Sequence, residues 1–272
     1  MSSYYYRPKV DPLLKASEDA DLKKQIEEIH EEFPYYGYRR LHEHILKNTG
    51  EIINEKKIRR VMSKFNLWPI RKIKFKVATT DSNHFERIYP NHIQGMMLNG
   101  VDQVWGADIT YVRIRTGFLY LAVIMDLYSR RIVGWAISSS LDSGLCLEAL
   151  KMAIAKRKPK KGLIHHSDRG VQYASRAYVN VLKDHGIIPS MSAKGNPYDN
   201  AFLESLMKTI KHDEVHLKEY ETLTDVLENL PKFIEDVYNT KRLHSGLGYQ
   251  SPDEFEKKLL TMALDKRPIL QL

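Results

Sequence analysis

The sequence predicts a mixed α/β protein preceded by a smaller all-helical region, and three observations support this. Apolar residues recur at helical spacing between Leu22 and Phe65. Residues 104–140 hold three runs of strand-forming composition separated by short polar breaks. From residue 145 onward, helical patterns alternate with short apolar runs, the order expected when helices flank a mixed sheet.

The bulk composition fits a soluble globular protein. The 272 residues suffice for one large domain or two smaller ones, and 43% hydrophobic with 28% charged content argues against wholesale disorder. The net charge of +8 favours a polyanionic partner, nucleic acid first, although many basic proteins bind none. The opening MSSYYYRPKV lacks the pattern of a secretory signal, and no apolar run is long enough to span a bilayer.

The single cysteine, Cys146, excludes an internal disulfide framework and a cysteine-rich zinc site. We expect it to act as a small apolar residue on a helix. A cytoplasmic protein without a membrane segment is therefore predicted.

Residues 1–68 are predicted to form a helical, helix-turn-helix-like DNA-binding region. Helices are expected in LKKQIEEIHEEF (22–33), in YRRLHEHILKN (38–48) and in EKKIRRVMSKF (55–65), the last capped by Asn54. Three short helices with a tight glycine-containing connection suggest a helix-turn-helix. A small helical bundle with a solvated basic face is the alternative.

The third helix is basic, and its side chains are candidates for contacts with DNA phosphates in a groove. These candidates are Lys56, Lys57, Arg59, Arg60 and Lys64. Residues 69–100 follow as a basic linker that could track a phosphate backbone, because PIRKIKFKVATTDSNH alternates basic and apolar residues before it becomes polar.

Residues 101–218 are predicted to form the α/β domain. Strands at 104–115, 118–129 and 132–140 make an antiparallel meander. A helix, a short strand (163–168), a second helix, a short strand (187–193) and a third helix follow. The order β-β-β-α-β-α-β-α adds parallel strands to the meander. Residues 219–272 are predicted to be a helical extension interrupted by the loop KRLHSGLGYQSP.

Two aspartates occupy positions where chemistry is common. Asp108 lies on a strand face that is otherwise becoming apolar, which is costly unless the carboxylate is paired or binds a cation. Asp168 ends the fourth strand, at the carboxyl edge where α/β sites collect. Taken singly, Asp108 could be a buried hydrogen-bond partner and Asp168 a loop-forming residue before Gly170.

Glu204 is the third candidate, on the helix of NPYDNAFLESLMKTIKHDE. We expect Asn196 to cap this helix, Pro197 to take its first position and Asp199 to favour its positive end. The predicted buried stripe is Phe202, Leu203, Leu206, Met207 and Ile210. The predicted polar line is Asn200, Glu204, Lys208 and Lys211. Taken alone, Glu204 with Lys208 is an ordinary surface pair.

Three carboxylates together suit Mg²⁺ or Mn²⁺, which prefer oxygen ligands. With two ions, one can activate a nucleophilic oxygen while the other stabilises the leaving oxygen. Lys208 and Lys211 are then placed to hold the phosphates of DNA ends.

The motifs WGADIT, HSDRGVQY and KGNPYDNAFLESLMKTIK, in this order, resemble the DDE transposases and retroviral-type integrases. Thirty-five residues separate Asp168 from Glu204, the spacing of that family's D,D(35)E signature, and Lys211 matches its basic residue seven positions past the glutamate. The resemblance is closest to OrfB-type transposases of bacterial insertion sequences. It extends from YYGYRRL to YNTKRLHSGLGYQSP, about residues 35–254.

This resemblance implies an RNase H-like (integrase catalytic core) mixed sheet in which Asp108, Asp168 and Glu204 bind two Mg²⁺ or Mn²⁺ ions. It implies nicking of DNA by water at the element ends, followed by attack of the freed 3′-hydroxyl on another strand. No phosphate-binding P-loop motif is present, so ATP is not expected. The candidate site-lining side chains are His166, Arg169 and Asn200. Late-motif residues without an assigned chemistry are Tyr238, Asn239, Arg242 and His244.

The resemblance also implies partners. Double-stranded DNA, both element ends and target, is the expected substrate, bound by a homo-multimer near the nucleoid in the bacterial cytoplasm. An upstream-frame protein, separate or fused, is expected to supply further end recognition. Two alternatives stay open: an RNase H-like nuclease that only hydrolyses, and a catalytically inactive DNA-binding protein.

Overall fold

In the computed structural model, the chain divides into two compact units, Met1–Ile73 and Lys74–Leu272. The structure describes residues 12–70, 86–115, 117–193 and 200–272. None of the described helices is long and apolar enough to cross a membrane.

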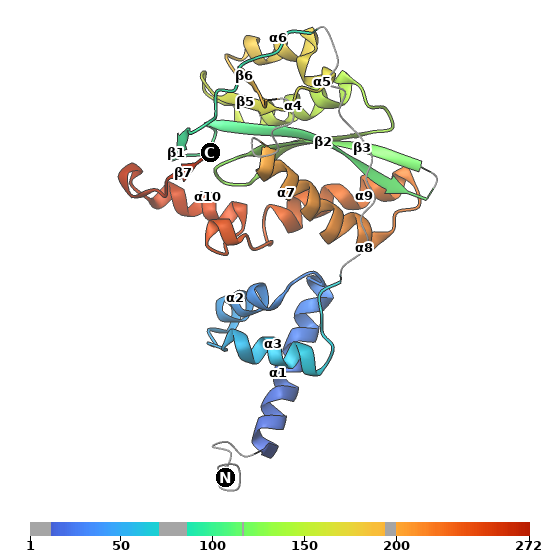
Figure 1. The fold of residues 1–272 in the computed structure, drawn as a ribbon, viewed down its shortest axis with the longest axis vertical. Helices are drawn as coiled ribbons and strands as arrows, with labels where there is room; N and C mark the ends of the chain where they lie inside the picture. Colours follow the sequence, from blue (N-terminus) through green and yellow to red (C-terminus); the bar gives the residue numbers. More distant parts are fainter. Residues whose placement is uncertain (1–11, 71–85, 116, 194–199) are drawn as a thin grey trace. The chain divides into compact units, whose positions relative to one another are not determined.

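The described part of the first unit, residues 12–70, consists of three helices (Figure 1). They are α1 (Pro12–Glu32), α2 (Tyr38–Thr49) and α3 (Glu55–Lys64). The cap predicted at Asn54 is confirmed, because its side chain accepts a hydrogen bond from the backbone N–H of Lys56 at 2.8 Å. The first helix begins at Pro12, ten residues before the predicted start at Leu22. The prediction missed its first turns because they lack the apolar repeat of the later ones.

The second unit is built on a five-stranded sheet in the order β4-β3-β2-β5-β6. The strands are β2 (Val104–Ile114), β3 (Gly117–Asp126), β4 (Ile132–Ser138), β5 (Ile164–Ser167) and β6 (Ile188–Met191). The antiparallel meander β2-β3-β4 and the parallel pairs β2-β5 and β5-β6 confirm the predicted mixed sheet.

Helices cover both faces of this sheet, as Figure 1 shows. One face packs against α4 (Ser143–Arg157), α5 (Val171–Ala174) and α6 (Arg176–Asp184). Cys146 is buried in this layer, as predicted. The other face packs against α7 (Ala201–Ile210), α9 (Leu223–Lys232) and α10 (Pro252–Thr261). The short helical segments between them are the π-helical η2 (Lys211–Val215), α8 (His216–Lys218), the π-helical η3 (Phe233–Tyr238), and the single turns η4 (Ser245–Leu247) and η5 (Leu264–Lys266).

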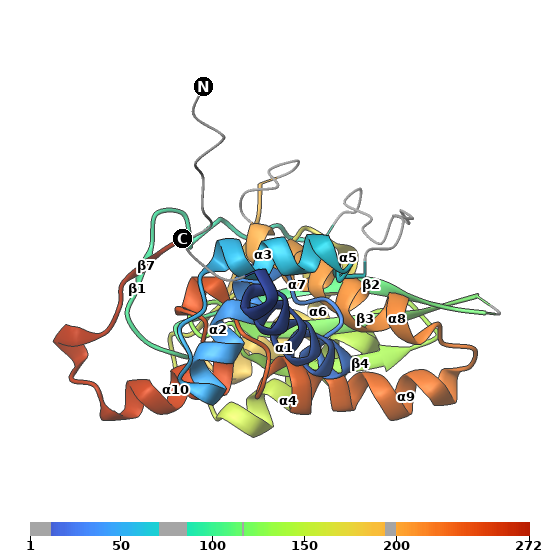
Figure 2. The same cartoon turned by 90° about the horizontal axis from the view of Figure 1, so that it is seen from below.

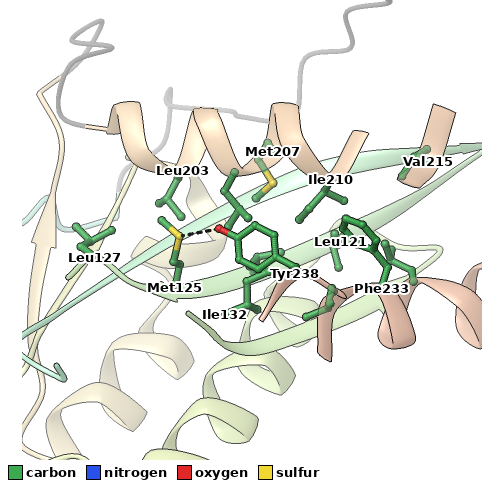
Figure 3. Packing of buried hydrophobic residues seen from close by; sticks show 14 of the residues in the cluster. Leu121, Met125, Leu127, Ile132, Leu203, Met207, Ile210, Val215, Phe233 and Tyr238 are labelled. Carbon is green, nitrogen blue, oxygen red and sulfur yellow. Dashed lines mark hydrogen bonds between the residues drawn. The ribbon is translucent and has the colours of Figure 1, made fainter. Parts of the chain in front are cut away.

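The core beneath α7 draws on distant parts of the chain (Figure 3). Met125 of β3 accepts a hydrogen bond at its sulfur from the Tyr238 hydroxyl at 3.8 Å. Ile93 and Leu98, from the region interpreted as a linker, belong to the same cluster, as does Leu259 of α10. The regions before and after the predicted catalytic segment therefore share one hydrophobic core with it.

A further contact fixes the carboxyl-terminal extension on the sheet. The Asn239 side chain accepts a hydrogen bond from the backbone N–H of Ile132 at 2.9 Å and donates one to the carbonyl of the same residue at 3.0 Å. Because Ile132 begins the edge strand β4, this amide satisfies backbone groups that the ladder leaves open. Asn239 of the late motif thus has a structural role.

A two-stranded ribbon was not predicted. It pairs β1 (Met97–Leu98) with β7 (Leu270–Gln271) in antiparallel fashion (Figures 1 and 2). Strands of this length carry no alternation that a sequence pattern could reveal.

Gly134 of β4 offers a test of the packing of the sheet against α4. A β-carbon there would overlap the Ala149 carbonyl oxygen and lie 2.8 Å from the Ala153 β-carbon. We expect Gly134→Ala to destabilise the protein by about 2–3 kcal/mol in urea unfolding, because helix backbone cannot yield as a side chain can. Gly246→Ala, where nothing lies within 4 Å, is the control and should change stability by less than about 0.5 kcal/mol. Equal effects would refute this account.

Candidate active site and DNA-binding helix

Asp108 and Asp168 are brought together by the pairing of β2 with β5. The two strands are parallel, and their last paired residues are Ala107 and Ser167. The next residue on each strand path is an aspartate, and neighbouring strands lie about 4.8 Å apart. The parallel pairing therefore brings Asp108, within β2, next to Asp168, which directly follows β5.

The pKa of Asp108 reports how the acids influence one another. This pKa is raised to about 7, mainly by burial and in addition by the negative charges of Asp168 and Glu204. The backbone N–H of Ile109, which donates to the Asp108 carboxylate at 2.8 Å, and the charge of Lys211 act in the opposite direction. The three predicted acids and the predicted lysine thus belong to one electrostatic site.

The helix that carries Glu204 packs closely on β2. Gly106 lies on the same strand face as Asp108, and a β-carbon on it would lie only 2.9 Å from a methyl carbon of Leu203. The missing side chain therefore leaves room for Leu203, the residue immediately before Glu204. The Glu204 side chain is 44% exposed and pairs with Lys208 at 3.3 Å.

The predicted start of the helix of Glu204 lies largely outside the described residues. In the described part of the chain, α7 begins at Ala201, with Asn200 at the N-cap position and no capping bond from its side chain. Asn196, Pro197 and Asp199 lie outside the described residues. The predicted buried stripe is confirmed for Leu203, Leu206, Met207 and Ile210, whereas Phe202 is only partly buried.

Lys211 lies where α7 gives way to the π-helical turn η2. Its ammonium is 3.6 Å from the centroid of the Tyr111 ring in β2, a cation–π contact. Burial lowers the pKa of Lys211, and the negative charge of Asp108 opposes this. Sequence reasoning missed Tyr111, because an aromatic residue in a strand reads as core.

His166 and Arg169 brace the Asp168 loop against β6. The buried His166 ring lies within hydrogen-bond distance of the Ser190 and Ser192 hydroxyls, at 2.9 and 3.1 Å. Arg169 donates to the Ser192 carbonyl at 2.8 Å. These contacts hold the turn that follows β5 to the segment leading towards α7.

The carboxylates do not form a compact ligand set. Among the described residues, no three histidine, cysteine, aspartate or glutamate side chains are grouped closely enough to hold a metal ion. The acids interact through their charges rather than by converging on one point.

The basic side chains of helix α3 fall into two groups: those paired with carboxylates of α1 and those exposed to solvent. Asp19 of α1, with 1% of its side chain exposed, accepts hydrogen bonds from Arg60 at 2.6 and 2.7 Å and from Lys64 at 3.0 Å. Lys57 pairs with Glu18 at 2.7 Å. The Arg60 guanidinium holds the pKa of Asp19 well below its usual range.

Lys56 and Arg59 form the second group. Both are exposed, and neither makes an ion pair with any described residue. Of the five predicted phosphate contacts on α3, three are thus engaged within the unit and two are directed to solvent.

The influence of the acids on Asp108 can be measured directly. Carbon-detected NMR of the carboxyl groups in chelator-treated protein should show Asp108 titrating near pH 7. Asp168→Asn should lower that midpoint, and Glu204→Gln should lower it by less, because each removes a negative neighbour. Glu228→Gln, on the exposed side of α9, is the control. An Asp108 midpoint near 4 in the wild type would contradict the geometry.

Comparisons with known proteins agree with this architecture. Family models of the integrase core domain match residues 99–197 and 185–252, and a model of an HTH-like domain matches residues 16–75. The cryo-electron microscopy structure of the simian T-cell lymphotropic virus intasome in complex with PP2A regulatory subunit B56 gamma is similar in fold. Its TM-score is 0.51 at 15% identity, covering 91% of this chain and 78% of that chain.

Two insertion-sequence proteins are similar over most of their length. The transposase for insertion sequence element IS904 of Lactococcus lactis is 40% identical over 230 residues, 84% of this chain and 90% of that protein. The IS600 31 kDa protein of Shigella sonnei is 37% identical over 264 residues, 96% of both chains. With the mixed sheet, the helical unit and the integrase-core matches, these identities show that the chain belongs to the insertion-sequence transposase family with an integrase core domain.

Proposed function

We propose that this transposase cleaves DNA at element ends and joins them to a target, with Asp108, Asp168 and Glu204 as the ligands of two divalent ions. The observation that supports it best is the raised pKa of Asp108, caused by burial and by the charges of the other two acids. Family membership makes the chain a polynucleotidyl transferase that acts in DNA recombination.

The residues fit a hard divalent ion such as Mg²⁺ or Mn²⁺. Their donors are carboxylate oxygens, and a cation would relieve the mutual repulsion that disfavours the charged form of Asp108. Glu204 must release Lys208 to take part, and an exposed pair of this kind costs little to break. Bound ions would stabilise the charge that develops during in-line attack on a phosphodiester.

The chain's own side chains then position the DNA. In cleavage, water attacks a phosphodiester at the element end and the 3′-oxygen leaves as a hydroxyl after protonation. In transfer, that hydroxyl attacks a target phosphodiester. Lys208, with 75% of its side chain exposed, and Lys211 beside Asp108 are proposed to hold the phosphates.

The helical unit binds DNA, and we assign phosphate contacts first to Lys56 and Arg59. Lys57, Arg60 and Lys64 contribute less, because their charges are balanced by α1. A multimer on DNA, an upstream-frame partner and a location at the nucleoid complete the proposal, because two element ends must be brought together for transfer.

Glu204→Gln tests the catalytic assignment. In assays with labelled element ends and Mg²⁺ or Mn²⁺, we expect joined products to fall by roughly 10³-fold while DNA binding persists. Glu228→Gln is the matched control and should retain activity. Hydrolysis without joining by the wild type would favour a nuclease. If the wild type did neither, even with the upstream protein added, an inactive DNA-binding protein would be the better description.

The two faces of α3 predict different salt dependences. Replacing Lys56 and Arg59 by alanine should weaken DNA binding and reduce the slope of log affinity against log salt by roughly 2, about 0.9 per phosphate contact. Lys57→Ala combined with Lys64→Ala removes the same formal charge, but both lysines are already paired with α1 carboxylates, so the slope should change less. Equal changes in the two double variants would argue that both faces contact DNA.

A further inference from the structure

The π-helical turn η2 is held by a buried ion pair from the late motif. Arg242 donates to the Asp213 carboxylate at 2.8 Å, and the two side chains are only 6% and 4% exposed. Arg242 also donates to the Thr209 hydroxyl of α7 at 3.3 Å. Thr209 precedes Lys211 by two residues and Asp213 follows it by two, so a single guanidinium brackets Lys211.

The shape of the π-helical turn η2 explains why it needs the contacts from Arg242. Asp213, Glu214 and Val215 are all buried, and three consecutive residues cannot all face inward on one narrow side of a regular α-helix. A widened turn accommodates them but loses the regular hydrogen-bond pattern. Each buried carboxylate has its own partner, since the Tyr220 hydroxyl donates to Glu214 at 2.6 Å. The turn therefore depends on side-chain contacts for its shape.

Arg242 is itself firmly placed. Its backbone N–H donates to the Val237 carbonyl of η3 at 2.8 Å, next to Tyr238 in the core beneath α7. Replacing a buried ion pair by apolar residues is often neutral for stability, so the Arg242–Asp213 pair is not needed to keep the protein folded. Its contribution is to hold two chain segments in one fixed geometry. Removing one partner, by contrast, leaves an uncompensated buried charge.

We infer that Arg242 is a positioning residue for Lys211. By fixing the turn on both sides of Lys211, it directs the ammonium onto the Tyr111 ring, three residues along β2 from Asp108. The inferred effect on catalysis rests on the proposed function, whereas the effect on the place of Lys211 does not.

The position of the Lys211 ammonium can be measured by NMR, without an assay of enzyme activity. In full-length protein with carbon-13 at the lysine ε-position, the Tyr111 ring should shift the Lys211 signal upfield, and Tyr111→Leu identifies that signal. We expect Arg242→Met to remove the shift. Arg157→Met is the matched control, because Arg157 also lies in a charged network, with Asp102 and Glu256, but remote in sequence from α7. An unchanged Lys211 signal in folded Arg242→Met protein would overturn the inference.

The rate of strand transfer provides a second test of the inferred role of Arg242. Arg242→Met should lower kcat for strand transfer by roughly 10–100-fold with KM for DNA nearly unchanged, as expected for a misplaced group. The charge-swapped double variant Asp213→Arg with Arg242→Asp should recover part of both the NMR shift and kcat. If Arg242→Met does not fold, Asp213→Asn serves in its place. A lost NMR shift with unaltered kcat would refute the catalytic half, and an inactive wild type would refute the proposed function while the NMR result still decides the positioning.

Discussion

The alignment of two parallel strands is the constraint on which the site depends. Because β2 and β5 pair up to Ala107 and Ser167, the next residues of both strands are forced into proximity, and both are aspartates. Like charges at such a distance oppose each other's ionisation, and burial adds to this at Asp108. The fold thus holds a repulsive arrangement that a divalent cation would relieve.

The third acid is supplied by a helix whose place depends on distant chain segments. Leu203 fits the space beside Gly106, and the far end of the helix is tied by Arg242 to the late motif. Asn239 and Tyr238 join that motif to the edge strand and to the core. The carboxyl-terminal extension is therefore best regarded as a support for α7. This gives physical meaning to motif residues that have no evident chemistry of their own.

Much of this could be predicted from sequence because it follows from local patterns. The strand alternation, the Asn54 cap and the stripe from Leu203 to Ile210 are all local signals, and the order of elements predicted the mixed sheet. The involvement of Asp108 with Asp168 and Glu204 came from spacing and resemblance, and the structure adds the register that explains it.

What escaped prediction depends on contacts between remote residues. Asp19 and Arg60 are 41 residues apart, so the sequence could not show that this basic side chain of α3 is already paired. The π-helical turns arise from tertiary packing, so no periodic pattern in the sequence indicates them. The nearest local signal is Pro231, which lacks a backbone N–H and lies two residues before η3.

Crystallographic location of Mn²⁺ by its anomalous scattering tests the central claim most directly. Crystals of the full chain would be equilibrated with Mn²⁺ near pH 8, above the pKa of Asp108. The account predicts an anomalous peak about 2.1 Å from carboxylate oxygens of both Asp108 and Asp168, absent in Asp108→Asn protein. Mn²⁺ bound only elsewhere, with these two carboxylates unliganded, would contradict it.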